Sequence, residues 1–263
     1  VTMKVLHVYR TYFPDTQGGV QETVRQISLG TTSLGVSNKI YTPSTNPNPA
    51  VLEHPEGDVH RVKLNFEVAS CGFCITGIPD FKELANWADI VHYHFPWPFA
   101  DALHFLGNVK KPTLVTYHSD VVRQKALLKL YSPLMNRFLK SAGRIICTSP
   151  NYANSSKVLE KLHKPFGTIP IGLNRDFYPE VEQADVDRNR ELYGEDFFLF
   201  VGLFRYYKGL DTLIEAARLT SKKIIIVGEG PLEKELKQKV TDYELSNVVF
   251  TGYLPDNNKV ALL

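Results

Sequence analysis

Several features that would assign the chain to a narrow class are scarce in this sequence. Its 263 residues carry a formal net charge of +2, too small by itself to indicate nucleic-acid binding. No apolar run reaches transmembrane length, and Val1–Lys4 leads directly into a strand pattern in place of a signal peptide. We therefore expect a cytoplasmic globular chain that starts naturally at Met3 and forms one large or two small domains.

Cysteine is also scarce, with three residues in the chain. Cys71 and Cys74 form one C-x-x-C pair, and Cys147 lies in an apolar run. A structural zinc site needs four ligands, so one such pair is too few, and we expect no metal. The dinucleotide fingerprint G-x-G-x-x-G is absent as well, and we expect no cofactor.

The apolar runs that are present predict an α/β protein. In the first part of the chain we expect strands over residues 4–9, 39–42, 59–66, 89–93, 113–117, 144–147 and 167–170. Helices are expected over 20–29, 79–87, 121–141 and 151–162. Residues 44–56 are rich in Pro, Asn and Ser and should form a loop. A strand, a glycine-containing loop and a helix in this order are typical of a doubly wound domain.

The second part repeats the same order on a smaller scale. We expect strands over 197–201, 223–227 and 248–250, and helices over 210–219 and 232–243. A turn-rich segment, 171–180, precedes them. The sequence therefore predicts two Rossmann-like domains, 1–173 and 174–263.

Two cations follow the apolar strand 197–201. Gly202 ends this strand, Arg205 and Lys208 lie in a short loop, and a helix begins at Leu210. Cations beyond the carboxyl end of a strand and at a helix N-terminus form a site for a phosphate group. Arg supplies a planar fork of donors and Lys a point charge. Two cations that only face water remain the alternative.

Two further candidates follow strands in the first part of the chain. Gly18 and Gly19 would let backbone N–H groups approach a ligand without an intervening side chain, although a plain tight turn would use the same residues. His118 follows strand 113–117, and ligands of open α/β sheets bind beyond the carboxyl ends of strands. A capping or core histidine is the alternative for His118.

The segment 94–99 combines two prolines with aromatic residues. We expect a rigid loop in which Phe95, Trp97 and Phe99 are exposed and offer stacking surfaces to a sugar or lipid, with local packing as the alternative. His92 and His94 are expected to face opposite sides of the strand, which would make them a poor metal pair.

The long helix 121–141 carries many cations and no neighbouring acidic residue. Its apolar stripe consists of Leu127, Leu130, Tyr131, Leu134, Met135 and Phe138. Its cations, with one just beyond, are Arg123, Lys125, Lys129, Arg137, Lys140 and Arg144. We expect attachment to an anionic membrane surface, and a solvated helix face is the alternative.

Several of these motifs together resemble one enzyme family. They are Gly18-Gly19-Val20, Thr116-Tyr117-His118-Ser119-Asp120, Val201-Gly202 with Arg205 and Lys208-Gly209, Gly228-Glu229-Gly230-Pro231 and Gly252-Tyr253. Their order over essentially the whole chain resembles the retaining GT-B glycosyltransferases of family four. Residues 7–15, 93–96 and 204–210 are similar to bacterial O-antigen mannosyltransferases that use GDP-mannose.

This resemblance implies two Rossmann-like domains that face a cleft. The first would hold the acceptor, a growing glycan on a polyprenyl diphosphate, through Val20, Glu22, His94, Phe95 and Trp97. The second would hold a nucleotide sugar, GDP-mannose in the closest group. Donor-binding residues would be Gly18, Gly19, Gly202, Arg205, Lys208, Gly228, Gly230, Tyr253 and Leu254.

The resemblance also implies a mechanism. Arg205 and Lys208 would stabilise the leaving diphosphate in place of a divalent metal. His118, the third residue with a catalytic role, would touch the donor sugar. The departing phosphate oxygen would take the acceptor proton with retention, so the paired carboxylates of glycoside hydrolases are not required.

Two departures from the family pattern lead to a further expectation. Ser119 separates His118 from Asp120, whereas the family has the aspartate directly after the histidine. The Glu-x7-Glu motif that grips donor sugar and ribose would lie after Leu263. Val260, Leu262 and Leu263 should therefore lack packing partners, and we expect an incomplete second domain and little transfer from these 263 residues.

Other functions remain open at this point. A nucleotide-sugar epimerase shares the GT-B architecture, but the Arg-x-x-Lys pair favours transfer. The donor could also be UDP-glucose or UDP-N-acetylglucosamine, or the chain could be a non-catalytic subunit of a glycan synthesis complex.

Overall fold

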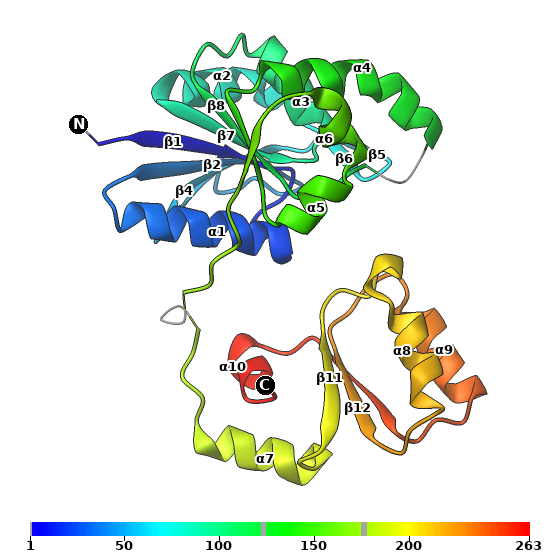
Figure 1. Cartoon of the computed structure of the whole chain (residues 1–263). Coiled ribbons are helices and arrows are strands. Elements are labelled where there is room, and N and C mark those ends of the chain that lie inside the picture. Colours follow the sequence, from blue (N-terminus) through cyan, green and yellow to red (C-terminus); the bar gives the residue numbers. More distant parts are fainter. Residues whose placement is uncertain (1, 122–124, 175–177) are drawn as a thin grey trace. The chain divides into compact units, whose positions relative to one another are not determined.

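A computed structural model describes residues 2–121, 125–174 and 178–263. The chain divides into two compact units, Val1–Leu173 and Asn174–Leu263. Figure 1 shows the first unit in blue to green and the second in yellow to red. Each unit has its own sheet and its own core, so each is described by itself.

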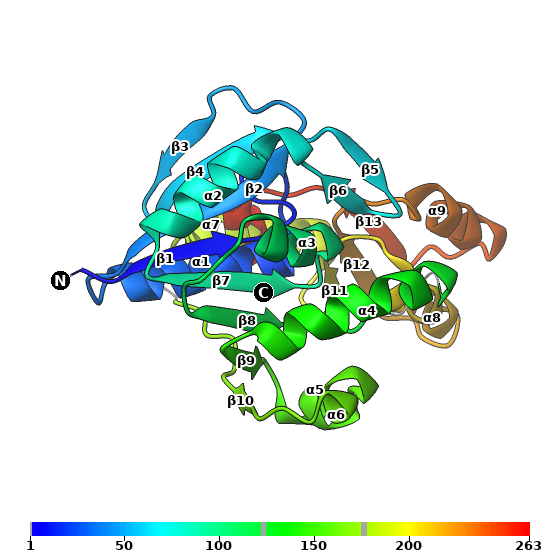
Figure 2. The same ribbon diagram turned by 90° about the horizontal axis from the view of Figure 1, so that it is seen from above.

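The first unit is built on an eight-stranded sheet with the order β10-β9-β8-β7-β1-β2-β4-β3. Its neighbouring strands are parallel except for β3, which pairs antiparallel with β4. The strands are β1 (Lys4–Val8), β2 (Ser37–Ser44), β3 (Val51–His54), β4 (Gly57–Lys63), β7 (Ile90–Phe95), β8 (Thr113–Tyr117), β9 (Arg144–Cys147) and β10 (Phe166–Thr168). Figure 2 shows this sheet from above.

Helices cover both faces of this sheet, as Figure 1 shows. One face carries α1 (Gly19–Thr32), and the other carries α2 (Ile78–Trp87), α3 (Pro98–Leu106) and α4 (Lys125–Ser141). Smaller elements complete the unit: β5 (Phe66–Val68), β6 (Cys71–Phe73), η1 (Ile75–Gly77), α5 (Pro150–Ser155) and α6 (Lys157–Leu162).

The two faces of the first sheet differ in chemistry because side chains alternate along each strand. Leu6 and Val8 of β1 belong to the large apolar core that includes residues of α2, α3 and α4. On the α1 face, Ile40 and Val59 pack with Val24 of α1. His7, between Leu6 and Val8, points to this second face, where it contacts Asn38.

The second unit has a smaller parallel sheet with β12 in the middle. Its order is β11 (Phe197–Val201), β12 (Lys223–Val227) and β13 (Val248–Gly252). One face packs on α8 (Leu210–Ala217) and α9 (Glu233–Asp242) through Ile214, Ile224 and Leu236. Further elements are α7 (Gln183–Tyr193), η3 (Tyr206–Lys208) and α10 (Asp256–Val260).

The expectation that the chain's last apolar residues have nothing to pack on is wrong for Leu262. This side chain is 6% exposed and packs with Ile225 and Val227 on the face of the sheet away from α8. Tyr193 of α7 joins the same cluster. Leu263, by contrast, is 90% exposed. Both faces of the small sheet are therefore covered in part.

The structure contains elements that the sequence pattern did not predict. Strand β3 lies inside the expected loop 44–56, α3 begins inside the expected aromatic loop, and α7 precedes β11. Among the described residues, no helix is long and apolar enough to span a membrane.

Candidate functional site

The backbone of His118 is held by the strands beside it. His118 directly follows β8, and its N–H donates to the carbonyl of Phe95 at the end of β7 (3.0 Å). The side chain is half-buried, and its Nε2 lies 3.1 Å from Nδ1 of His94. The structure thus places His118 at the carboxyl ends of two adjacent strands.

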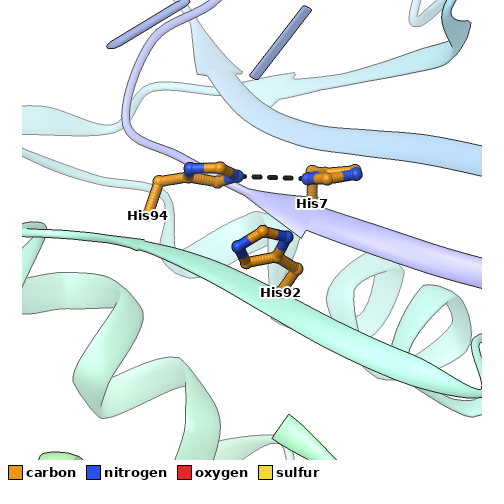
Figure 3. Close-up of side chains that lie close together, drawn as sticks. All are labelled: His7, His92 and His94. Atoms are coloured by element: carbon orange, nitrogen blue, oxygen red, sulfur yellow. Dashed lines mark hydrogen bonds between the residues drawn. The ribbon is translucent and has the colours of Figure 1, made fainter. Parts of the chain in front are cut away.

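Three buried histidines lie beside His118 on the α1 face. His7 comes from β1, and His92 and His94 come from β7 (Figure 3). His7 Nδ1 is 3.1 Å from His94 Nε2, and the rings of His92 and His94 are 4.4 Å apart. The expectation that His92 and His94 face opposite sides is wrong, because residues two apart on a strand share a face.

Burial keeps these histidines neutral. It lowers the pKa of His7 to about 4, and it also lowers the pKa of His118 to about 4. The pKa values of His92 and His94 fall well below the usual range, first through burial and then through the neighbouring rings. Each ring therefore has one N–H donor and one nitrogen lone pair near neutral pH.

Neutral imidazoles that lie this close could either share protons or ligate a metal. One nitrogen from each of His7, His92 and His94 lies within 4.8 Å of the other two. His92 also has Nε2 2.7 Å from the hydroxyl of Thr116. The spacing of His92 and His94 therefore does not argue against a metal site. Whether the histidines ligate a metal or share protons depends on which ring nitrogens carry the protons.

The cysteines belong to the packing of the first unit. Cys74 is buried with its thiol 3.3 Å from the hydroxyl of Tyr41, and burial raises its pKa to about 12. Cys71 is half-buried, and burial raises its pKa as well. Metal ligation requires the thiolate, so both groups are poor ligands.

The glycine pair lies at the N-terminus of α1. Gly18 is the cap residue, and a Cβ there would lie 2.8 Å from Gln21 Oε1, whereas a Cβ on Gly19 would meet no described atom beyond its neighbours within 4 Å. The amide of Gln21 donates to the hydroxyls of Thr11 (2.7 Å) and Thr16 (3.0 Å). The loop is therefore fixed from within, and Gly19 leaves the first turn of the helix open to a ligand.

Val20 and Glu22 lie on the same first turn of α1. Both side chains are half-buried. The Glu22 carboxylate accepts from Gln26 Nε2 (2.7 Å) and lies 3.7 Å from the guanidinium of Arg25. The carboxylate is thus partly neutralised within its own helix.

The expectation of exposed rings after β7 is wrong. Phe95 and Trp97 are each 1% exposed, and Phe99 is 5% exposed. Trp97 Nε1 donates to the carbonyl of Gly72 (3.0 Å), and the Phe95 ring stacks on Tyr117 with centroids 4.6 Å apart. All three rings belong to the apolar core of the first unit, with Phe99 in the first turn of α3, and they offer no surface for stacking.

Asp120 has a structural position. Its carboxylate accepts from the hydroxyls of Tyr117 and Ser156, each at 2.7 Å, and its N–H donates to Tyr152. These bonds tie the end of β8 to α5 and α6. The inserted Ser119 thus leaves the aspartate engaged in holding this corner of the unit.

In the second unit, Arg205 and Lys208 are exposed, and neither forms a salt bridge within the described parts of the chain. A backbone hydrogen bond joins them across η3, from the Lys208 N–H to the Arg205 carbonyl (2.9 Å). Gly209 then adopts φ +72° and caps α8. Both cations thus precede a helix N-terminus, as the sequence predicts.

The glycines after β12 allow two loops to approach closely. A Cβ on Gly228 would lie 2.1 Å from the carbonyl oxygen of Gly202, and one on Gly230 would lie 2.7 Å from the backbone of Phe204. The Phe204 N–H donates to the Glu229 carbonyl at 2.9 Å. Packing alone therefore explains Gly228 and Gly230, and their contact with a donor stays a prediction.

The loop after β13 is tied to the same region. The Tyr253 N–H donates to the Glu229 carboxylate (3.3 Å), so one of its two backbone groups already has a partner. The Tyr253 ring is 56% exposed, and Leu254 packs in the apolar cluster beneath. The Tyr253 carbonyl and the Leu254 backbone remain candidates for contact with a base.

Comparison with known proteins shows which family the chain belongs to. Residues 17–177 match the family model described as Glycosyltransferase Family 4. The chain belongs to this family. Residues 181–263 match a second model, Glycosyl transferases group 1. The expected enzyme class is confirmed, and the protein is a glycosyltransferase.

Two bacterial relatives are similar over nearly the whole chain. D-rhamnosyltransferase WbpZ of Pseudomonas aeruginosa is 46% identical over 261 residues, which cover 99% of this chain and 68% of the relative. The O-antigen chain mannosyltransferase C of Escherichia coli is 44% identical over 272 residues, with 99% and 70% covered. The chain thus spans about 70% of these relatives.

The solved structures confirm the GT-B fold. Sucrose-phosphate synthase from Thermosynechococcus elongatus aligns with a TM-score of 0.74 at 21% identity, over 99% of this chain and 72% of that chain. The part of the solved chain without a counterpart here is consistent with an incomplete second domain.

In this glycosyltransferase, sequence reasoning missed the residues behind His118. His7 and Asn38 contact each other on the α1 face, and neither was a candidate. The signal was present, because His7 interrupts an apolar strand and His92 and His94 continue its face on the next strand. The order of the strands in the sheet, which the sequence alone does not reveal, was needed to show that these histidines lie together.

Proposed function

We propose that this glycosyltransferase transfers mannose from GDP-mannose to a lipid-linked O-antigen or related polysaccharide acceptor. Retention and independence from a metal are part of the proposal. The observation that carries it is the similarity over 99% of the chain to an enzyme named as an O-antigen chain mannosyltransferase. The relative named as a D-rhamnosyltransferase supports the same sugar class, because D-rhamnose is 6-deoxymannose.

The second unit is proposed to bind the donor. Arg205 and Lys208 are exposed cations without a described carboxylate partner, so they can neutralise a diphosphate at no cost of a broken ion pair. Fixed cations aimed at developing negative charge stabilise a departing nucleoside diphosphate. Gly202, Gly228 and Gly230 would shape the loops around it, and the backbone of Tyr253 and Leu254 would meet the base.

The first unit is proposed to bind the acceptor and to touch the donor sugar. Gly18 and Gly19 would offer backbone donors, while Val20 and Glu22 would lie at the acceptor. His118 would contact the sugar without proton transfer, which agrees with its lowered pKa. Direct stacking of an acceptor on Phe95 or Trp97 is not proposed, because both rings are buried.

A donor panel tests the proposal. A chain that spans the full length of its relatives is incubated with GDP-mannose, GDP-D-rhamnose, UDP-glucose or UDP-N-acetylglucosamine and a lipid-linked acceptor. We expect transfer of mannose, and mass spectrometry with NMR of the anomeric proton identifies the sugar and its configuration. Exclusive transfer of D-rhamnose would favour the second candidate that the 46% relative supports. Conversion of the donor without acceptor would indicate an epimerase.

Peripheral attachment to an anionic membrane is proposed through α4. Leu127 and Leu130 are 47% and 81% exposed, and Lys129 and Lys140 of the same helix are also exposed. Each cation near an anionic leaflet contributes about 1 kcal/mol. Arg123 lies outside the described residues. Charge reversal of Lys129 and Lys140 should reduce sedimentation with anionic vesicles, whereas Lys234→Glu in the second unit should not.

A further inference from the structure

A row of hydrogen bonds crosses the α1 face of the first sheet and ends at His118. It starts at Asn38 of β2, whose Oδ1 lies 3.3 Å from His7 Nε2. It continues from His7 Nδ1 to His94 Nε2 (3.1 Å), the contact drawn as a dashed line in Figure 3. The last bond joins His94 Nδ1 to His118 Nε2 (3.1 Å). The row therefore links three neighbouring strands, β2, β1 and β7, to the residue that follows β8.

The Asn38 end of the row fixes the direction of the protons. Its Nδ2 lies 3.0 Å from the backbone carbonyl of Ser28, and a carbonyl only accepts, so this atom is the amide nitrogen. The hydroxyls of Thr31 (3.1 Å) and Thr32 (3.0 Å) lie near the same nitrogen, so its two N–H groups are shared among three oxygens. The amide oxygen therefore faces His7, and His7 must donate from Nε2.

The donor nitrogen of each following ring is determined by the ring before it, because a neutral imidazole has one donor and one acceptor nitrogen. With its proton on Nε2, His7 accepts at Nδ1, and His94 must donate from Nε2. His94 then accepts at Nδ1, and His118 must donate from Nε2. The remaining nitrogen of His118, Nδ1, bears a lone pair and has no hydrogen bond to a described residue.

We propose that Asn38, His7 and His94 are positioning residues that hold His118 in the Nε2–H tautomer, so that Nδ1 presents a hydrogen-bond acceptor to a hydroxyl group of the donor sugar. The tautomer follows from the protein alone, and the sugar contact rests on the proposed function. The lowered pKa values of His7 and His118 agree with neutral rings.

A metal ion on the three buried histidines would require the opposite arrangement. His7 Nδ1 and His94 Nε2, which face each other, would both need lone pairs, so the hydrogen bond between them would be lost and the proton of His94 would move to Nδ1. His94 would then donate from Nδ1 to His118, and His118 would carry its proton on Nδ1. Among the described residues, no carboxylate joins this group of ligand atoms, and an unpaired buried cation is costly. The structure therefore favours the shared protons.

The tautomer of His118 decides between the two arrangements. We would label the histidines of the 263-residue chain with ¹⁵N and record long-range ¹H–¹⁵N spectra at about pH 8, where an unperturbed histidine is neutral. We expect a protonated Nε2 and an unprotonated Nδ1 on His118, and the same pattern on His7 and His94. A proton on Nδ1 of His118, or stoichiometric metal in elemental analysis of the untagged protein, would overturn the proposal.

Matched variants of two adjacent buried histidines test the connection. His94→Phe interrupts the row, so the His118 nitrogen signals should move toward the averaged values of His163, which is exposed. His92→Phe makes the same replacement beside it but leaves the row intact, so the His118 signals should not move. Circular dichroism shows whether both variants fold. If His94→Phe is unfolded, the wild-type tautomer alone still decides.

Donor titration separates the tautomer from the sugar contact. A chain that spans the full length of its relatives is saturated with GDP-mannose. This should shift the Nδ1 signal of His118, whereas free GDP should leave the signal unchanged. An unmoved Nδ1 signal with bound GDP-mannose would overturn the contact. Failure to bind any nucleotide sugar would contradict the proposed function and not the tautomer, which is read in the free protein.

Discussion

The two units present their candidate residues in opposite ways. In the first, neutral histidines lie against the sheet, and bonds of 3.1 Å join His7, His94 and His118. In the second, Arg205 and Lys208 carry full charge and are exposed. A neutral hydrogen-bonding group must be oriented to be useful, whereas a cation acts through its field.

This difference has a structural counterpart in each unit. In the first unit, buried polar contacts orient the ring of His118. These contacts begin at the backbone carbonyl of Ser28, which fixes the amide of Asn38. The second unit places glycines so that the loop bearing the cations can pack tightly on its neighbour. Substitutions should therefore act on orientation in one unit and on charge or backbone packing in the other.

Loss of one cation should have the largest effect. Arg205→Ala or Lys208→Ala removes stabilisation of the leaving diphosphate, and loss of one preorganised donor typically lowers turnover about 10²–10³-fold. Steady-state transfer by a chain that spans the full length of its relatives measures this loss of turnover. Arg188→Ala, which removes an exposed cation on α7, is the control. A cation variant that retains half of wild-type turnover would refute the clamp.

Acid should destabilise the first unit and spare the second. His7 has a folded pKa of about 4 against an unfolded value of 6.5, so between these values the unfolded state binds more protons. Stability is thus complete above about pH 6.5 and falls by about 3 kcal/mol for this group as the pH drops to 4. Residues 174–263 contain no histidine.

Urea unfolding followed by NMR signals of each unit checks this difference. The midpoint of the first unit should fall steeply below pH 6.5, while that of the second should change little. His163→Gln replaces an exposed histidine and should leave the pH dependence intact. Equal acid sensitivity of both units would contradict the assignment to the buried histidines.

Gly228→Ala should destabilise the second unit by about 1–3 kcal/mol, because the new Cβ would collide with the Gly202 carbonyl. The positive φ of +127° at Gly228 adds strain. Gly19→Ala is the control for stability, since its Cβ meets open space. Thermal unfolding measures both, and an unchanged midpoint for Gly228→Ala would show that the two loops can separate without cost.

His118→Ala should have the smallest of these effects on turnover, about tenfold, as expected for one neutral hydrogen bond. Binding of free GDP, measured by calorimetry, should survive. Ser119→Ala, next to it and exposed, is a matched control. Equal weakening of GDP binding would mean that the histidine serves the nucleotide or the fold.

The local pattern of apolar residues was sufficient to predict much of the fold. Strands 113–117, 197–201 and 223–227 begin and end where their apolar runs predict. The pattern failed at two elements: β3, inside a Pro- and Asn-rich stretch, pairs with β4, and α3 begins at Pro98, the second of two nearby prolines. Leu262 was misjudged because its partners lie on β12.

The site was predictable where one loop carries it and not where several strands do. Arg205 and Lys208 lie three residues apart beside a strand end, so sequence order alone places them. The row behind His118 draws on three strands, β2, β1 and β7, and its bonds span from 24 to 87 residues of sequence. Only the strand order and the α1 face of the sheet bring these residues together.

The buried indole of Trp97 makes the first unit optically distinguishable. The chain has two tryptophans, Trp87 and Trp97, and both precede Leu173. Trp97 is 1% exposed and hydrogen-bonded to Gly72, so its emission should shift to the red when this unit opens. The second unit contributes only tyrosine emission. Selective excitation of indole would therefore follow the histidine-bearing unit alone, without any added label.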